Sequence, residues 1–236
     1  MEKISIHIET IDWTMGETVG LRIMPKEGST VYVSWGDGKV QTFKGKQLTV
    51  EDELEEIQYG NLQWFKAGHA YPEKGCGYNI IISTDDDGGI VGFDGCNMFE
   101  VKTMDLNFKE CPGLRLMCYS GYGEEHLDVS HNPLLEYVNI HEINNIKLDF
   151  SANPQLKFLA LRGAKDLTSL NLSKNDQLRH LDIFLCQNLQ HLALSNQSIL
   201  SEVDFALTAL RPRDLEHLKR TMERNKPYKI CGGSMY

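Results

Sequence analysis

A fixed period in the second half of the chain constrains its fold more than any other feature. Pairs of apolar residues separated by one position recur at steps of 10 or 11 residues, and every second step has a similar polar turn, so the full period is 21 to 22 residues. Such a period predicts a solenoid, in which each coil buries its apolar side against its neighbours. The pairs are Leu127/Val129, Val138/Ile140, Leu148/Phe150, Leu159/Leu161, Leu170/Leu172, Leu181/Ile183, Leu192/Leu194 and Val203/Phe205, with weaker copies at Met104/Leu106 and Leu116/Cys118.

The pattern inside each period points to one class of solenoid. Residues 167–175 read LTSLNLSKN, which fits the leucine-rich-repeat pattern L-x-x-L-x-L-x-x-N. Because side chains alternate across a strand, both apolar residues of a pair are expected to point inward and their neighbours outward. The amides of the residues in the asparagine register are expected to form a ladder that satisfies backbone groups in the turns. These residues are Asn132, Asn153, Asn175 and Gln197.

The end of the solenoid needs a cover, and residues 212–224 are predicted to supply it as a helix. Pro212 suits the first helical turn, and Leu215, Leu218 and Met222 fall on one helical face. Residues 228–231 are expected to add a last strand. The sequence therefore predicts a solenoid of about five repeats with a C-terminal capping helix.

The first part of the chain follows a different construction. Fourteen of the 20 glycines lie in the first 100 residues, whereas 24 of the 28 leucines follow residue 105. Short runs of alternating apolar and polar residues predict an antiparallel β-sandwich. We therefore expect a mostly β protein with two domains, residues 1–87 and 88–236. The alternating runs are Ile4–Ile8, Val19–Met24, Val31–Trp35, Val40–Phe43 and Tyr78–Ile82.

Three motifs in this first part carry a resemblance. Trp35-Gly36-Asp37-Gly38, followed by His69-Ala70-Tyr71 and by residues 75–82, resembles the W-G-D-G and H-x-Y-x-x-x-G-x-Y-x-V-x-L signatures of PKD-like, immunoglobulin-type β-sandwich domains. With the repeats and the terminal helix, the chain resembles bacterial leucine-rich-repeat proteins that have an N-terminal PKD-like domain. The resemblance implies export to the cell envelope or surface. If Met1 is the native start, the missing leader instead indicates the cytoplasm.

No motif for catalysis or cofactor binding is present. The chain lacks a phosphate-binding G-x-x-x-x-G-K-[ST] loop, a G-x-S-x-G elbow and a C-x-x-C pair. His141-Glu142 begins like a zinc-protease helix but lacks the second histidine, and Asp85–Asp87 lacks the later glutamate of a calcium loop. We therefore expect no catalytic residue, no metal and no cofactor.

Charge and hydropathy exclude two further classes. The formal net charge of -9 argues against a surface built to neutralise nucleic-acid phosphates. No apolar run approaches the roughly 20 residues that cross a bilayer, so no membrane-spanning segment is expected.

The six cysteines are too irregularly spaced for a disulfide framework, and most are expected to be buried thiols. A monomer is the favoured oligomeric state.

Candidate functional residues flank the inward pairs on one side of the predicted solenoid. Exposed aromatic rings with arginine and histidine are typical of an interaction surface. We expect a non-enzymatic binding protein that recognises a protein or a glycan. One alternative is a structural spacer or self-assembly element of the cell envelope, and a second is an enzyme with a site near the insertion at 46–68. The candidate binding residues are Tyr119, Tyr137, Phe158, Arg162, His180 and Phe184.

Overall fold

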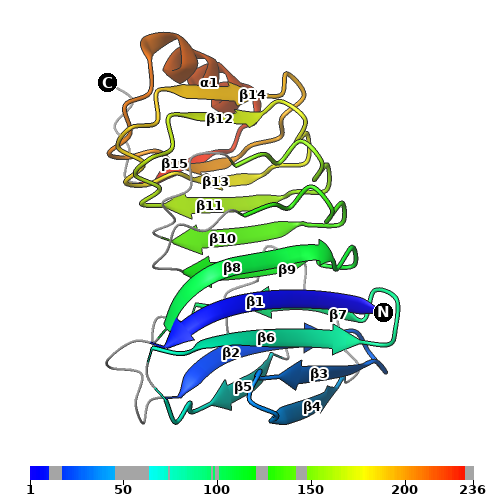
Figure 1. Ribbon diagram of the computed structural model, residues 1–236. Helices are drawn as coiled ribbons and strands as arrows, with labels where there is room; N and C mark the ends of the chain where they lie inside the picture. Colours follow the sequence, from blue (N-terminus) through cyan, green and yellow to red (C-terminus); the bar gives the residue numbers. More distant parts are fainter. Residues whose placement is uncertain are drawn as a thin grey trace.

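The computed structural model describes residues 1–10, 18–45, 64–73, 75–96, 98, 101–120, 127–141 and 148–231. Over these ranges the protein is mostly β, with a single helix, α1 (Pro212–Arg224), near the C-terminal end. Antiparallel strands occupy one end, and a solenoid-like stack of parallel strands leads from them to α1 (Figure 1). The mostly β class and the helix at 212–224 are thus confirmed. Most of the insertion at 46–68 lies outside the described residues.

The first sheet is antiparallel and has the strand order β4-β3-β6-β1-β8. The alternating pattern of Ile4, Ile6 and Ile8 buries these side chains, because every second residue of a strand faces the same side. The predicted solenoid pair Met104/Leu106 lies in this sheet instead, since β8 pairs with β1. The strand bounds are β1 (Glu2–Thr10), β3 (Thr30–Ser34), β4 (Val40–Lys44), β6 (Gly77–Thr84) and β8 (Val101–Glu110).

The second sheet runs through both parts of the chain, in the order β16-β15-β13-β11-β10-β9-β7-β2-β5. Its strands are parallel from β16 to β7 and antiparallel from β7 through β2 to β5. The proposed division at residues 87 and 88 stays a prediction. The bounds are β2 (Val19–Pro25), β5 (Phe65–His69), β7 (Ile90–Asp94), β9 (Leu116–Ser120), β10 (Tyr137–His141), β11 (Phe158–Arg162), β13 (His180–Asp182), β15 (Glu202–Asp204) and β16 (Lys229–Cys231).

Apolar columns fill the interior of the solenoid. The partners Val138, Leu159, Leu181 and Val203 follow one another in register across β10, β11, β13 and β15, and all are fully buried. On the other wall, β12 (Ser169–Leu172) pairs in parallel with β14 (His191–Leu194). Each buried side chain therefore contacts its counterparts in the coils above and below, which is how a stack of coils gains stability.

Three asparagines form the expected ladder in the turns. The Asn153 amide Nδ2 donates to the carbonyl oxygens of Val129 at 2.9 Å and of Asn132 at 2.8 Å. Asn132 and Asn175 repeat this geometry one coil away on either side. Each buried amide therefore satisfies two carbonyl groups that the turn leaves without a strand partner.

The expected fourth member of the ladder was wrong. Gln197 is exposed and the neighbouring Ser198 takes the buried position, because the Ser195 hydroxyl accepts the Gln197 N–H and turns the chain. The Ser198 carbonyl instead accepts a hydrogen bond at 2.9 Å from Nδ2 of Asn225, the residue after α1. The capping segment thus supplies the amide that the last coil lacks.

The W-G-D-G segment of the first part makes long-range contacts. Gly36 has φ of 86°, and a Cβ there would lie 2.8 Å from the Asn79 carbonyl oxygen, so glycine is needed. The Tyr71 hydroxyl donates to the Trp35 carbonyl at 2.8 Å, and the His69 ring stacks on Trp35 at 5.4 Å. These contacts connect three motifs that are far apart in the sequence.

Candidate binding face

The outward side of the parallel strands β9 to β16 is called the outer face here. Three sets of in-register residues cover it. The first column is Leu116, Tyr137, Phe158, His180, Glu202 and Lys229. The second column is Cys118, Asn139, Ala160, Asp182 and Asp204. The far rim carries His141, Arg162 and Phe184.

The first column contains a stack of three rings. The centroids of Tyr137 and Phe158 are 4.2 Å apart with an interplanar angle of 11°, and those of Phe158 and His180 are 4.2 Å apart at 8°. Parallel strands bring these rings together because their spacing of about 4.8 Å is close to the stacking distance of aromatic rings. The sequence thus builds a continuous aromatic column from residues 21 and 22 positions apart.

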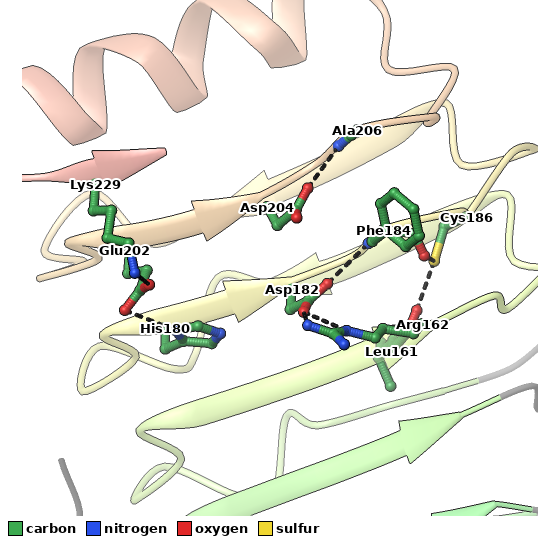
Figure 2. A network of polar contacts seen from close by, with 10 residues as sticks. All are labelled: Leu161, Arg162, His180, Asp182, Phe184, Cys186, Glu202, Asp204, Ala206 and Lys229. Atoms are coloured by element: carbon green, nitrogen blue, oxygen red, sulfur yellow. Dashed lines mark hydrogen bonds and ion pairs between the residues drawn. The ribbon is translucent and has the colours of Figure 1, made fainter. Parts of the chain in front are cut away.

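The aromatic column continues as a chain of charged groups. His180 Nδ1 lies 3.2 Å from Glu202 Oε2, and Glu202 Oε1 accepts a hydrogen bond of 2.7 Å from Lys229 Nζ. Figure 2 shows these three side chains on successive strands of the outer face. The C-terminal end of the column therefore changes from apolar to ionic.

Asp182 in the second column accepts hydrogen bonds from two residues of the far rim. Arg162 Nε donates to Asp182 Oδ2 at 2.6 Å, while Asp182 Oδ1 accepts the N–H of Phe184 at 3.1 Å (Figure 2). The hydrogen bond to Asp182 raises the pKa of Arg162, so the guanidinium is fixed in its charged form. Asp204 accepts the N–H of Ala206 at 3.0 Å in the same way as Asp182. Both aspartates shape the turn that follows their strand.

A second ionic cluster lies beside the start of the strands. The buried carboxylate of Glu136 accepts hydrogen bonds from Arg115 Nε at 2.6 Å and from Lys157 Nζ at 2.8 Å. The three residues belong to successive coils, and their backbones are also hydrogen-bonded to one another. Basic side chains therefore flank the aromatic column on both sides, with Arg115 and Lys157 opposite Arg162.

Tyr119 does not lie on the outer face, and this expectation was wrong. β9 pairs with β10 so that Leu116 is opposite Tyr137, which turns Met117 and Tyr119 into the core, where Tyr119 is fully buried. Residues 116–119 are apolar in both phases of the strand, so alternation alone does not define which phase points inward. The predicted inward pair Leu116/Cys118 is accordingly on the opposite side from the one expected.

The first coils of the outer face are covered. Leu116, Cys118 and Tyr137 are buried in a cluster with Met24, against which Trp64 also packs. Phe158, His180 and Phe184 are partly exposed, and Arg162 is exposed. The structure thus brings four of the six candidates together on open surface. We call the residues Phe158, Arg162, His180, Phe184, Glu202 and Lys229 the accessible half of the outer face.

Asp182, Glu136 and Glu202 complete the site and were not predicted. Asp182 stands between the two members of an inward pair, Leu181 and Ile183. Glu202 lies just before the inward residue Val203, and Glu136 lies two residues before the inward residue Val138. Collecting the charged residues at these positions of each coil would have found all three.

Metal-ligand clusters, reactive thiols and membrane-spanning helices are the other features that bear on function. No group of three or more His, Cys, Asp or Glu within the described ranges is placed to hold a metal ion. Burial raises the pKa of the Cys186 thiol to about 11, so this thiol is not activated. The described part of the chain contains no helix that is both long and apolar enough to cross a bilayer. Comparison with models of protein families, with curated proteins and with solved structures finds no match.

Proposed function

We propose that the protein is a non-enzymatic recognition protein that binds a protein or glycan partner with the accessible half of the outer face. Two finer assignments belong to the proposal: the coils are leucine-rich repeats, and the antiparallel part is a PKD-like β-sandwich. The buried apolar columns and the Asn132, Asn153 and Asn175 ladder support the first assignment. The contacts of Trp35 with His69 and Tyr71 support the second.

One observation carries the proposal: the partly exposed Phe158 and His180 rings lie stacked beside the exposed Arg162 on a hydrogen-bonded sheet. Aromatic and arginine side chains are enriched in protein interfaces and among the few residues that dominate their binding energy. Arg162 is held by Asp182 and Phe158 by its ring neighbours, so little side-chain freedom is lost on binding. A preformed surface of this kind suits recognition.

Arrays of peptides and of oligosaccharides, probed with the intact labelled chain, test the proposal. We expect probes that bind the wild-type protein to be lost in the double variant Phe158→Ala/Arg162→Ala. The matched control is Lys174→Ala, which removes an exposed basic side chain from the other wall of the solenoid and should leave binding unchanged. Probes retained by the double variant, once its fold is verified by circular dichroism, would contradict the proposal.

A further inference from the structure

We propose that the partner is a polypeptide that presents an acidic segment, and that Arg162 and Lys229 hold its carboxylates on the accessible half of the outer face. This inference rests on the proposed function and names the chemistry of the ligand. Three independent observations support it: the stacking of the rings, the exposure of the charged side chains, and the distribution of charge along the chain.

Both faces of the Phe158 ring are already used. Phe158 is stacked between Tyr137 and His180, with interplanar angles of 11° and 8° and centroid distances of 4.2 Å, so both of its faces are covered. Sugar rings bind aromatic side chains mainly through the faces, whereas the edge of an aromatic ring carries positive partial charge. A ligand therefore meets the edge of the Phe158 ring, which favours the oxygen atoms of carboxylates and peptide carbonyls over a sugar face.

The arginine and lysine side chains of this face are more exposed than their carboxylate partners. The side chain of Arg162 is 52% exposed and that of Asp182 only 3%. Lys229 and Glu202 show the same order, with 71% and 32%. Arg115 and Glu136 repeat it with 50% and 10%. An approaching molecule thus meets positive groups first, and anionic side chains are the complementary ligands.

The distribution of charge along the chain also favours an acidic ligand. Residues 150–236, which contain the accessible half, have 12 basic and 8 acidic side chains, a net charge of +4. Residues 1–149 have 12 basic and 25 acidic side chains, a net charge of -13. The basic excess lies at the C-terminal end of the outer face: residues 211–229 have seven basic and three acidic side chains, whereas residues 150–210 have five of each. An acidic ligand is therefore attracted toward the end of the face that carries Lys229 and repelled by the acidic first part of the chain.

The spacing of the two cations fits an extended peptide. Arg162 ends β11, Lys229 begins β16, and three strand steps separate them. With about 4.8 Å between strands and about 3.3 Å per residue along them, the two side chains lie roughly 20 Å apart. An extended segment of about six residues spans this distance. Acidic residues at both ends of such a segment match both cations.

Fluorescence anisotropy with four probes tests the inference on the intact chain. The probes are a Glu-rich peptide of about eight residues, a Gln-rich peptide of the same length, a galacturonate oligomer and a neutral glucan oligomer; the peptide length follows from the strand rise. We expect the Glu-rich peptide to bind and the Gln-rich peptide not to bind. Raising the salt from about 50 to 500 mM should weaken binding, because exposed charges are screened.

Variants locate the site. Arg162→Gln should weaken binding of the Glu-rich peptide about tenfold, and Lys229→Gln about threefold. Lys229→Gln provides a test that does not depend on Asp182, which Arg162→Gln leaves without its partner. The control is Arg220→Gln, which removes the same charge from an exposed position of α1 where the side chain is 75% exposed. An equal loss in Arg220→Gln would overturn the assignment to the outer face.

The other outcomes separate this inference from the proposed function. Binding of galacturonate or glucan that Phe158→Ala abolishes, without binding of the Glu-rich peptide, would overturn the acidic-peptide partner and leave the binding face standing. Concentration-dependent association of the protein that Arg162→Gln abolishes would replace the partner with a second copy of this chain. If the Glu-rich peptide does not bind and the arrays yield no ligand sensitive to the face variants, both proposals are wrong.

Discussion

The antiparallel part and the solenoid stabilise themselves in different ways. In the solenoid, one kind of contact is repeated from coil to coil, as in the column of Val138, Leu159 and Leu181. In the antiparallel part each contact occurs once, as in the stacking of Trp35 on His69. Because the contacts of the solenoid repeat, the position of a residue in the period predicts its environment. The single contacts of the antiparallel part join residues that are far apart in the sequence and that no local pattern connects.

The two parts nevertheless share buried structure. The nine-stranded sheet passes from β9 through β7 into β2. In addition, the buried Glu2 carboxylate accepts the N–H of Ile90 at 3.2 Å and the N–H of Gly113 at 3.0 Å. We therefore expect the antiparallel part and the solenoid to unfold together, and the predictions below test how far the difference between them extends.

The largest effect is expected from Leu159→Ala in the solenoid core. Truncating this fully buried side chain should lower the free energy of unfolding by about 2 to 5 kcal/mol. All three tryptophans lie before residue 65, and Trp64 packs on the cluster that contains Tyr137. Tryptophan fluorescence therefore does not report on the later coils that contain Leu159, while circular dichroism reports on the whole chain. If the parts are coupled, the substitution lowers the urea midpoint of the fluorescence transition and of the circular dichroism transition equally. An unchanged fluorescence transition would show that the parts unfold independently.

The asparagine ladder should give the next largest effect. Asn153→Ala removes the buried side-chain donor to the carbonyls of Val129 and Asn132, which then keep only their backbone donors within the turn, and this should destabilise the protein by about 1 to 3 kcal/mol in chemical denaturation. Asn196→Ala, at an exposed position of the same solenoid, is the control and should change stability by less than about 0.5 kcal/mol. Equal effects in the two variants would mean that the ladder is not structural.

Acid should weaken the antiparallel part through Asp37. Burial acts to raise the pKa of this carboxyl, but the hydrogen bond from the Lys39 N–H and the contact with His69 at 2.7 Å lower it overall. A lowered folded-state pKa contributes stability above the unfolded pKa of about 3.9, and this contribution is lost as the pH falls through the folded value. Asp37→Asn should therefore cost about 0.2 to 1 kcal/mol at pH 7, a difference that shrinks below about pH 4. A difference that stays constant in thermal melts down to that pH would contradict this assignment.

Thiol reactivity should differ between the parts without changing stability. Cys186 in the solenoid is buried, donates to the Leu161 carbonyl at 2.7 Å and has a pKa of about 11. Cys76 in the antiparallel part is partly exposed. Mass spectrometry after iodoacetamide treatment of the native protein should find Cys76 alkylated well before Cys186. Faster labelling of Cys186 would mean that its coil opens readily.

The sequence predicted the fold best where one phase of a strand is apolar and the other is not. Val138, Leu159 and Val203 lie in the core as expected for this reason. Tyr119 was misplaced because residues 116–119 are apolar in both phases, since that part of the sheet is covered on both sides. The pairing of β8 with β1 was missed because strand partners distant in the chain leave no periodic signal.

The candidate site was predicted in part for the same reason. Phe158 is in register with His180, and Arg162 and Phe184 follow them at the same spacing of 22 residues, so the period alone aligned them. The covering of Tyr137 depends on Met24 and Trp64, which belong to another part of the chain. The period therefore predicts which residues share a face, and long-range packing decides how much of that face is open.

Hydroxyl-radical footprinting of the native protein tests the central claim most directly, because it reports the exposure of single aromatic side chains. The account holds that the outer face is open at β11 to β15 and that Tyr119 belongs to the core. Phe158 and Phe184 should be oxidised in the native protein, while Tyr119 should be protected until the chain unfolds. Oxidation of Tyr119 as fast as that of Phe184 would contradict both the strand register and the binding face built on it.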